Sequence, residues 1–426
     1  MTDFLGTPAT APGPLGPRML RHTTMIRRDP LAFLTLMRDT YGDVVQFPIP
    51  RPPTYLVASA EATHQVLVGR PGCYDKETIQ YRSLALVTGD GLLVAPDRRW
   101  RDQRPVVQPA FHHAFLPVVG RIVADEVGAL VDRWRLAGPG AVVDVESAMM
   151  EVTLRVVGRS LFGDPLTGST AKLAEATLDA LSVVIQRSRV PVAFPRSWPT
   201  PANRRLGRAL RELDEAVARL AAQGGPGDGL LLDLLLAQPG WSDEQIRNQV
   251  VTFLVAGHET AASALMWALW LIAGDEAEGD ALADDPGRAR WVADETLRLY
   301  PPAWVISRSA TGPDDIADHA VPAGALVITS PYLVQRDSRY WSDPEVFAPD
   351  RFAARLSRRQ REAFIPFGAG LRQCIGRDFA RWEMAEVVAG LGAAFRFSRV
   401  GPPPRPLASV TLRPADGLLL RIDPRR

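Results

Sequence analysis

The stretch Phe367-Gly368-Ala369-Gly370-Leu371-Arg372-Gln373-Cys374-Ile375-Gly376 places one of the two cysteines of this chain in a loop rich in glycine. Glycine lets the backbone fold closely around the sulfur and turn its N–H groups toward it. Arg372, two residues before Cys374, adds positive charge. Such surroundings favour the thiolate, which is the form that ligates metals. The alternative interpretation is a buried structural cysteine in a glycine loop.

The composition is typical of a large soluble enzyme. Of the 426 residues 46% are hydrophobic, which is enough for a substantial core, and the formal net charge is +1. This balance argues against nucleic-acid or membrane-surface binding. With Cys73 and Cys374 alone there is no disulfide framework, so we expect a reducing cytoplasmic location and a structural role for Cys73. We also expect a monomer.

The N-terminal residues and one long apolar stretch indicate how the chain is organised into domains. Residues 1–20 lack an apolar core segment and are predicted to form a loose leader, followed by a single domain over residues 21–426. The stretch from Phe253 to Ala273 is close to membrane-spanning length. It contains His258 and Glu259, so we expect a buried helix that crosses a large core.

Local patterns predict a mainly α-helical fold with small β-sheets. Residues 44–47 and 55–58 should form a hairpin, and residues 116–236 should be helical, with breaks at 138–140, 191–201 and 224–227. Ser242-Asp243-Glu244-Gln245 offers a capping box that opens a helix running to about Ala273. Such a helix is roughly 45–50 Å long, long enough to traverse a whole domain.

Within this helix lies Ala256-Gly257-His258-Glu259-Thr260. Glycine costs a helix interior about 1 kcal/mol relative to alanine, and the close approach of a flat cofactor or ligand is one reason to keep it. A buried acid beside an alcohol could relay protons. The alternative is a helix kink with a satisfied polar pair, and we interpret His258 as satisfying local structure.

The two motifs resemble those of the cytochromes P450. The pattern Phe-x-x-Gly-x-Arg-x-Cys-x-Gly is similar to their haem-binding loop, and residues 256–260 are similar to their oxygen-binding groove. The resemblance implies the cytochrome P450 fold, with Cys374 as the thiolate ligand of the iron of haem b. It implies that Thr260 binds near dioxygen and that Glu259 supplies protons. Ala261 stands where the family often has a second threonine, which leaves the acid and the alcohol in place.

The same resemblance assigns further residues to the cofactor and to the core. The propionates of the haem would be held by Trp100 and Arg104, which are four residues apart, and by Arg308 and Arg372. Other expected haem contacts are Ala256, Phe367 and Gly368. Glu295 and Arg298, three residues apart, and Arg351 match a structural network that locks the core beneath the haem and is not catalytic.

By family position, the substrate pocket should draw on residues 77–93, 182–192, 253–256, 303–306 and 409–411. Within these segments we expect lining residues at Leu254, Val255, Trp304, Val305 and Val410. These side chains are apolar, and Trp304 is bulky enough to press a substrate against the haem. By analogy with soluble bacterial relatives, the substrate is expected to be a terpenoid or polyketide-derived natural product.

The source of electrons is the last expectation. No Gly-x-Gly-x-x-Gly follows a strand, so electrons should come from a separate ferredoxin and ferredoxin reductase. A docking face for the ferredoxin is predicted from five arginines around the two haem elements: Arg98, Arg99, Arg101, Arg377 and Arg381.

The predicted function is a monooxygenase that inserts one atom of O2 into an apolar small molecule by hydroxylation or epoxidation. Two alternatives are a haem-thiolate enzyme that uses peroxide or rearranges its substrate, and a non-catalytic haem sensor or carrier. Neither alternative would need the acid and alcohol at Glu259 and Thr260.

Overall fold

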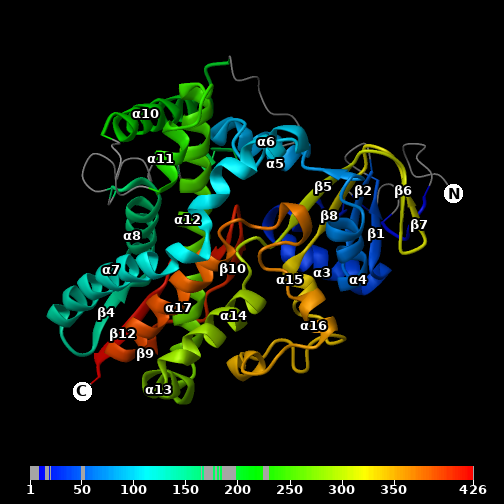
Figure 1. Cartoon of the computed structure of the whole chain (residues 1–426). Coiled ribbons are helices and arrows are strands. Elements are labelled where there is room, and N and C mark those ends of the chain that lie inside the picture. Colours follow the sequence, from blue (N-terminus) through cyan, green and yellow to red (C-terminus); the bar gives the residue numbers. More distant parts are fainter. Residues whose placement is uncertain are drawn as a thin grey trace. The chain divides into compact units, whose positions relative to one another are not determined.

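The computed structural model describes residues 9–14, 19, 21–48, 53–164, 166, 176–177, 180–181, 183–184, 198–223 and 230–425 (Figure 1). Two compact units divide the chain. Unit 1 is Met1–Gln80 with Leu297–Cys374, and unit 2 is Tyr81–Thr296 with Ile375–Arg426. The single domain expected over residues 21–426 stays a prediction. In the expected leader, Thr10 is hydrogen-bonded through its hydroxyl to the Tyr55 hydroxyl, 2.7 Å away.

A five-stranded sheet in the order β1-β2-β8-β5-β3 organises unit 1. Its strands are β1 (Val44–Phe47), β2 (Thr54–Val57), β3 (Tyr74–Asp75), β5 (Ile306–Ala310) and β8 (Leu326–Thr329). β1 and β2 pair antiparallel, which confirms the predicted hairpin. Successive side chains of β2 enter two different apolar clusters, Tyr55 and Val57 on one face and Leu56 on the other. β2 is therefore covered on both faces, which explains its apolar run Tyr55-Leu56-Val57.

Short helices and a second hairpin complete unit 1. The remaining elements are α2 (Thr23–Arg28), α3 (Pro30–Tyr41), α4 (Ala60–His64), a π-helical turn (Gln65–Gly69), β6 (Asp314–Ile316), β7 (His319–Val321), α15 (Pro331–Val334) and α16 (Arg358–Ala363), with 3₁₀ turns at Pro349–Phe352 and Gly370–Arg372. The N-terminus of α4 is capped by the Ser59 side chain, which accepts a hydrogen bond from Ala62 N–H.

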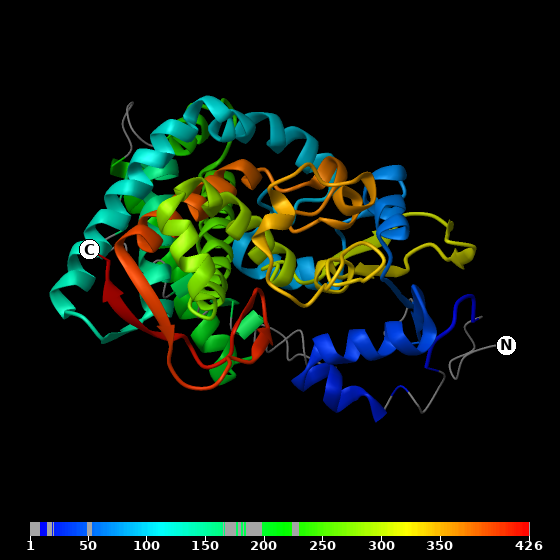
Figure 2. The same ribbon diagram turned by 90° about the horizontal axis from the view of Figure 1, so that it is seen from below.

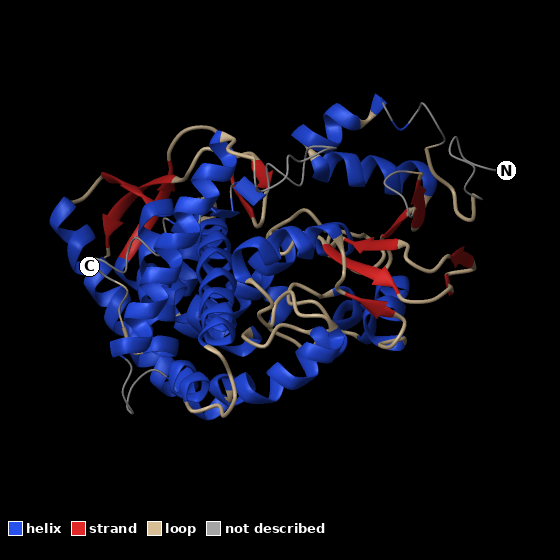
Figure 3. Cartoon of the chain, turned by 90° about the horizontal axis from the view of Figure 1, so that it is seen from above, coloured by secondary structure: helices blue, strands red, loops and turns tan. Residues whose placement is uncertain are grey.

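Unit 2 is mainly helical. Its helices are α5 (Ile79–Thr88), α6 (Asp97–Val107), α7 (Leu116–Ala137), α8 (Val145–Val157), α10 (Pro201–Gln223), α11 (Leu230–Leu236), α12 (Asp243–Ile272), α13 (Glu276–Asp284), α14 (Ala289–Leu299) and α17 (Arg377–Ala394), of which α5 and α14 cross into unit 1. Short 3₁₀ turns at Gln108–Phe111, His113–Phe115 and Pro286–Arg288 and a π-helical turn at Gly158–Phe162 join them. The described residues confirm a mainly α fold with small sheets (Figure 3).

The strands of unit 2 form a sheet and a hairpin. The sheet has the order β4-β12-β9, with β4 (Ala141–Asp144), β9 (Phe395–Arg399) and β12 (Leu419–Pro424), and Figure 2 shows β9 beside β12 near the C-terminus. β10 (Pro406–Ala408) and β11 (Leu412–Pro414) form the hairpin. The prediction of helix throughout residues 116–236 is wrong at β4, because β4 pairs with β12. The break predicted at 224–227 lies outside the described residues. So do residues 191–197 of the break predicted at 191–201.

The long helix α12 follows its sequence signals closely. The Ser242 side chain accepts from Gln245 N–H and the Gln245 side chain accepts from Ser242 N–H, so the predicted capping box is confirmed. The helix has 30 residues and packs against α8 and α17. It is long and apolar enough to cross a membrane, but 83% of its apolar window is buried inside the protein, as in the core helix of a soluble protein.

Candidate functional site

Backbone hydrogen bonds within the cysteine loop hold its conformation. Cys374 N–H donates to the Phe367 carbonyl at 3.0 Å, and Gln373 N–H donates to the Gly370 carbonyl at 3.0 Å. Cys374 itself is exposed. This exposure argues against the alternative of a buried structural cysteine.

Two glycines of this loop have backbones in the left-handed region, with φ of +67° at Gly368 and +72° at Gly370. At Gly370 the need for glycine is steric as well. A Cβ there would lie 2.0 Å from the Leu67 carbonyl oxygen, which belongs to the π-helical turn of unit 1. The loop thus packs backbone against backbone, and only glycine permits that approach.

Arg308 carries an unbalanced charge in the same unit. It lies on the inner strand β5, is 6% exposed, and donates to the carbonyl of its neighbour Ser307 at 2.8 Å. No carboxylate among the described residues forms an ion pair with it. A buried charge without a partner is costly. An anionic ligand, such as a carboxylate of a cofactor, would supply the missing partner.

In unit 2, the acid and the alcohol of the 256–260 segment have separate partners. The Thr260 hydroxyl donates to the Ala256 carbonyl at 2.6 Å, one turn earlier in α12. Glu259 is 6% exposed, and its Oε1 accepts a hydrogen bond from the Thr411 hydroxyl at 3.0 Å. Burial raises the pKa of Glu259, while the hydrogen bond from Thr411 and the charge of Arg413 oppose this rise. Glu259 is thus a carboxyl suited to exchanging a proton.

Gly257 and His258 serve the packing of α12 on α8. A Cβ at Gly257 would lie 2.8 Å from Val157 Cγ2, so close helix packing gives this glycine a reason other than a flat cofactor. His258 Nε2 is 3.0 Å from the Met150 carbonyl. Burial lowers the pKa of His258 to about 4, so the neutral ring donates this bond. The interpretation of His258 as structural is confirmed.

Arg298 and Arg351 converge on one segment of unit 1. The guanidinium of the fully buried Arg298 donates to the carbonyls of Gln335 (3.0 Å), Pro344 (2.6 Å) and Val346 (3.1 Å). Arg351 donates to the Asp343 carbonyl at 2.9 Å. These bonds fit the structural role predicted for the two arginines. Glu295, the third expected member, is fully buried on the same helix as Arg298.

The remaining expected haem residues lie in both units. On α6 the guanidinium carbon of Arg104 is 5.9 Å from the centroid of the Trp100 ring, so these two side chains share a face as predicted. Phe367, Gly368 and Arg372 are half-buried in the cysteine loop, and Ala256 is half-buried on α12.

The residues expected to line the pocket have varied surroundings. Leu254 and Val255 are buried on α12, at 0% and 5% exposed. Trp304 is partly buried and packs against the apolar cluster that includes residues of α3 and β1. Val305 and Val410 are half-buried. Most of the expected segment 182–192 lies outside the described residues.

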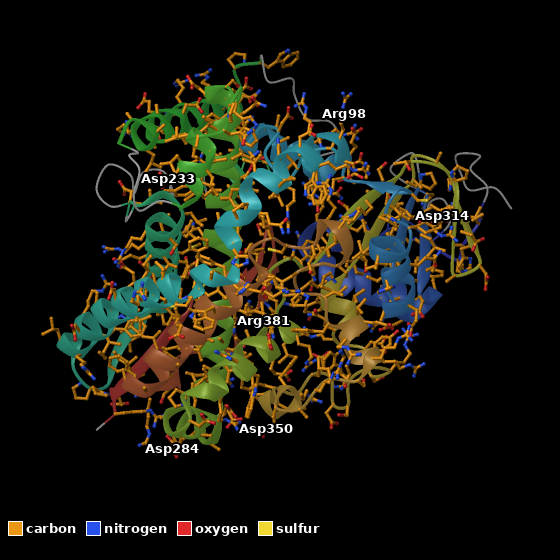
Figure 4. The ribbon with its side chains drawn as sticks, viewed as in Figure 1. Arg98, Asp233, Asp284, Asp314, Asp350 and Arg381 are labelled. Carbon is orange, nitrogen blue, oxygen red and sulfur yellow. The ribbon has the colours of Figure 1, made fainter. Side chains whose placement is uncertain are left out.

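The predicted positive face is divided. Arg99, Arg377 and Arg381 form ion pairs with Asp90, Asp378 and Asp294, respectively. Arg98 and Arg101 on α6 are exposed. Figure 4 shows Arg98 on α6 and Arg381 on α17 in well separated parts of unit 2. The five arginines therefore do not make one patch of uncompensated charge. Arg98 and Arg101 carry most of the positive charge that is not paired with a carboxylate.

Sequence reasoning missed two contacts of α12. One is the hydrogen bond from Thr411 to Glu259, although residue 411 was expected at the tip of the pocket. The other joins α12 to the segment before α6, where Leu92 N–H donates to Gln249 Oε1 at 3.2 Å. Both partners are far from α12 in the sequence, and no local pattern marks either of them.

Comparison with known proteins defines the class. The family model described as cytochrome P450 matches residues 11–277 and 289–421, so the chain belongs to the cytochrome P450 family. It is 32% identical to cyclooctat-9-en-7-ol 5-monooxygenase of Streptomyces melanosporofaciens, over 95% of this chain and 91% of the relative. It is 31% identical to pentalenene oxygenase of Streptomyces avermitilis, over 100% of this chain and 99% of the relative. Its fold matches the crystal structure of CYP175A1 from Thermus thermophilus with a TM-score of 0.83 and 32% identity, over 96% and 97% of the two chains.

Family membership makes the protein a monooxygenase with a haem-thiolate cofactor. The residues of unit 1 fit such a group. The exposed Cys374 offers a sulfur for the iron, and the buried Arg308 offers the cation that a propionate needs. Both observations come from the structure of this chain alone.

Proposed function

We propose that this enzyme inserts one oxygen atom from O2 into an apolar terpenoid, by hydroxylation or epoxidation, with electrons from a ferredoxin and its reductase. Two relatives that cover nearly the whole chain are a cyclooctat-9-en-7-ol 5-monooxygenase and a pentalenene oxygenase, both acting on terpenoid natural products. This supports a terpenoid over a polyketide-derived substrate. The cofactor is haem b, and the protein works as a cytoplasmic monomer.

Different residues have different roles in the proposed oxygenation. Bound haem supplies the oxygen and electron-transfer chemistry. Cys374 would ligate the iron, and Arg308 and Arg372 of the same unit would hold the propionates. For Trp100 and Arg104 of unit 2 the contact with a propionate stays a prediction. The apolar side chains of Leu254 and Val255 keep water from the substrate side of α12.

The buried acid next to an alcohol carries the proposal. Glu259 is buried with a raised pKa, so its carboxyl holds a proton more readily than an ordinary glutamate does and can release it again. Thr260, the next residue, presents a hydroxyl on the same helix. A peroxide-using enzyme or a haem sensor needs no proton supply of this kind, so the pair favours a monooxygenase that consumes O2 and reducing equivalents.

A turnover assay tests the proposal. Terpenes are first screened for a spin-state shift of the ferric protein, and the best ligands are then incubated with ferredoxin, reductase and NADPH. We expect an oxygenated product, with Thr260→Ala still binding haem and substrate but diverting electrons to hydrogen peroxide. Equal coupling of NADPH to product in Thr260→Ala would contradict the role of the alcohol. Turnover supported by peroxide alone would favour the alternative enzyme class.

A further inference from the structure

One face of α12 is joined to the β10–β11 hairpin by a row of side-chain hydrogen bonds. Glu259, Ser263 and Trp267 are spaced four residues apart, so they lie on the same face of the helix. Ser263 Oγ and Trp267 Nε1 both donate to the Leu412 carbonyl, at 2.6 and 2.9 Å. The hairpin is therefore held against two turns of α12 independently of Glu259.

The third hydrogen bond of the row involves an ionisable group, the Glu259 carboxyl. The Thr411 hydroxyl donates to Glu259 Oε1 at 3.0 Å, and the two residues are 1% and 6% exposed. Thr411 is itself fixed by a tight turn, because Ser409 N–H donates to the Thr411 carbonyl at 3.0 Å. A neutral hydroxyl that donates to a carboxylate in a buried site stabilises its ionised form. Here a rigid hairpin delivers that donor.

The other charged and polar groups near the Glu259 carboxyl are paired, neutral or hydrogen-bonded elsewhere. Arg413 on β11 acts on Glu259 through its charge, but its guanidinium is also paired with Glu146 of α8 at 3.0 Å. His258, the preceding residue, is neutral above about pH 4 because it is buried. The Thr260 hydroxyl donates to Ala256. Thr411 is thus the side chain that the structure shows hydrogen-bonded to the Glu259 carboxyl.

We propose that Thr411 is a positioning residue for proton delivery, whose hydroxyl holds the Glu259 carboxylate against the β10–β11 hairpin between proton transfers. The inference rests on the proposed function, in which Glu259 takes a proton from solvent and releases it toward Thr260. Thr411 keeps its own proton throughout. The hairpin thereby sets both the rotamer of the Glu259 side chain and the pH range over which its carboxyl takes up a proton again.

Infrared difference spectroscopy of the purified holoprotein tests this without substrate or electron donor. The protonated Glu259 carboxyl is identified as the C=O band that is missing in Glu259→Gln, and its pH midpoint is measured. In Thr411→Val, which keeps the shape but removes the hydroxyl, the midpoint should rise by about one to two pH units, because a hydrogen bond to the ionised form is lost. Thr411→Ser should keep a midpoint near that of the wild type.

A matched control separates this effect from loosening of the hairpin. Ser263→Ala removes a neighbouring hairpin bond without touching Glu259, so it should lower thermal stability and leave the midpoint unchanged. An unchanged midpoint in Thr411→Val would overturn the proposal, as would an equal rise in Thr411→Ser or Ser263→Ala. Because the titration needs no turnover, it can fail while the proposed oxygenation stands, and the converse also holds.

Discussion

Replacing Gly370 by alanine should damage the cysteine loop through one methyl group. The backbone of Gly370 has a φ of +72°, and an added Cβ would lie 2.0 Å from the Leu67 carbonyl oxygen and 3.0 Å from its carbon. Real Cβ atoms essentially never approach closer than 3.0 Å, so the two backbone segments must separate by about 1 Å. Gln373 N–H is bonded to the Gly370 carbonyl, so the shift passes to the residue next to Cys374.

The expected cost has two parts. Left-handed backbone costs an alanine about 1 kcal/mol, and forcing extra volume into a packed site costs about 1–3 kcal/mol. Gly370→Ala should therefore destabilise the protein by about 2–4 kcal/mol. Gly240 provides a matched control, because its φ is +78° but no other atom lies within 4 Å of the added Cβ. Gly240→Ala should cost about 1 kcal/mol, from backbone strain alone.

Urea unfolding and the spectrum of the reduced carbon monoxide adduct measure the two effects. We expect Gly370→Ala to unfold at clearly lower urea than Gly240→Ala and to lose part of the red-shifted Soret band. The reasoning is refuted if the two variants unfold together and both keep the full band, since the contact with Leu67 would then carry no weight.

Three further predictions concern the core, the pH dependence and the electron donor. Arg298→Ala should give apoprotein or aggregate, with a loss of about 3–5 kcal/mol, because three carbonyls lose a buried charged donor; a soluble, haem-loaded variant would contradict this. The pKa of His258 is lowered to about 4 in the fold, against an ordinary value of 6.5. The unfolded chain then binds the extra proton first, so stability falls as pH drops from about 6.5 to 4, by about 3 kcal/mol, and urea midpoints of His258→Gln should lack this slope. Reversing Arg98 and Arg101 to glutamate should slow first-electron transfer from an acidic ferredoxin and weaken its salt dependence while dithionite reduction is unchanged; a rate indifferent to both would place the docking face elsewhere.

Features set by neighbours in the sequence were the ones that could be predicted. The start of α12 follows from Ser242 and Gln245, which cap each other within one turn. The cysteine loop follows from Gly368 and Gly370, which adopt positive φ. In both cases the deciding interaction is local, so the residue types at fixed spacing carry the information.

Features set by distant partners could not be predicted. β4 is a strand because β12, near the C-terminus, pairs with it. Gly257 is explained by Val157 on α8, and the partner of Glu259 lies 152 residues further along the chain. The ion pairs that neutralise Arg99 and Arg381 likewise depend on where Asp90 and Asp294 are brought by folding. Composition and periodicity contain no signal for such pairs.

The ligation of haem iron by Cys374 is the central claim, and the reduced carbon monoxide spectrum tests it most directly. Wild-type protein should show the red-shifted Soret band that thiolate ligation gives. Cys374→Ser should lose this band, while Cys73→Ser should keep it, because Cys73 packs against the apolar core of unit 1. A wild-type spectrum typical of histidine ligation, or a band that survives in Cys374→Ser, would contradict the account.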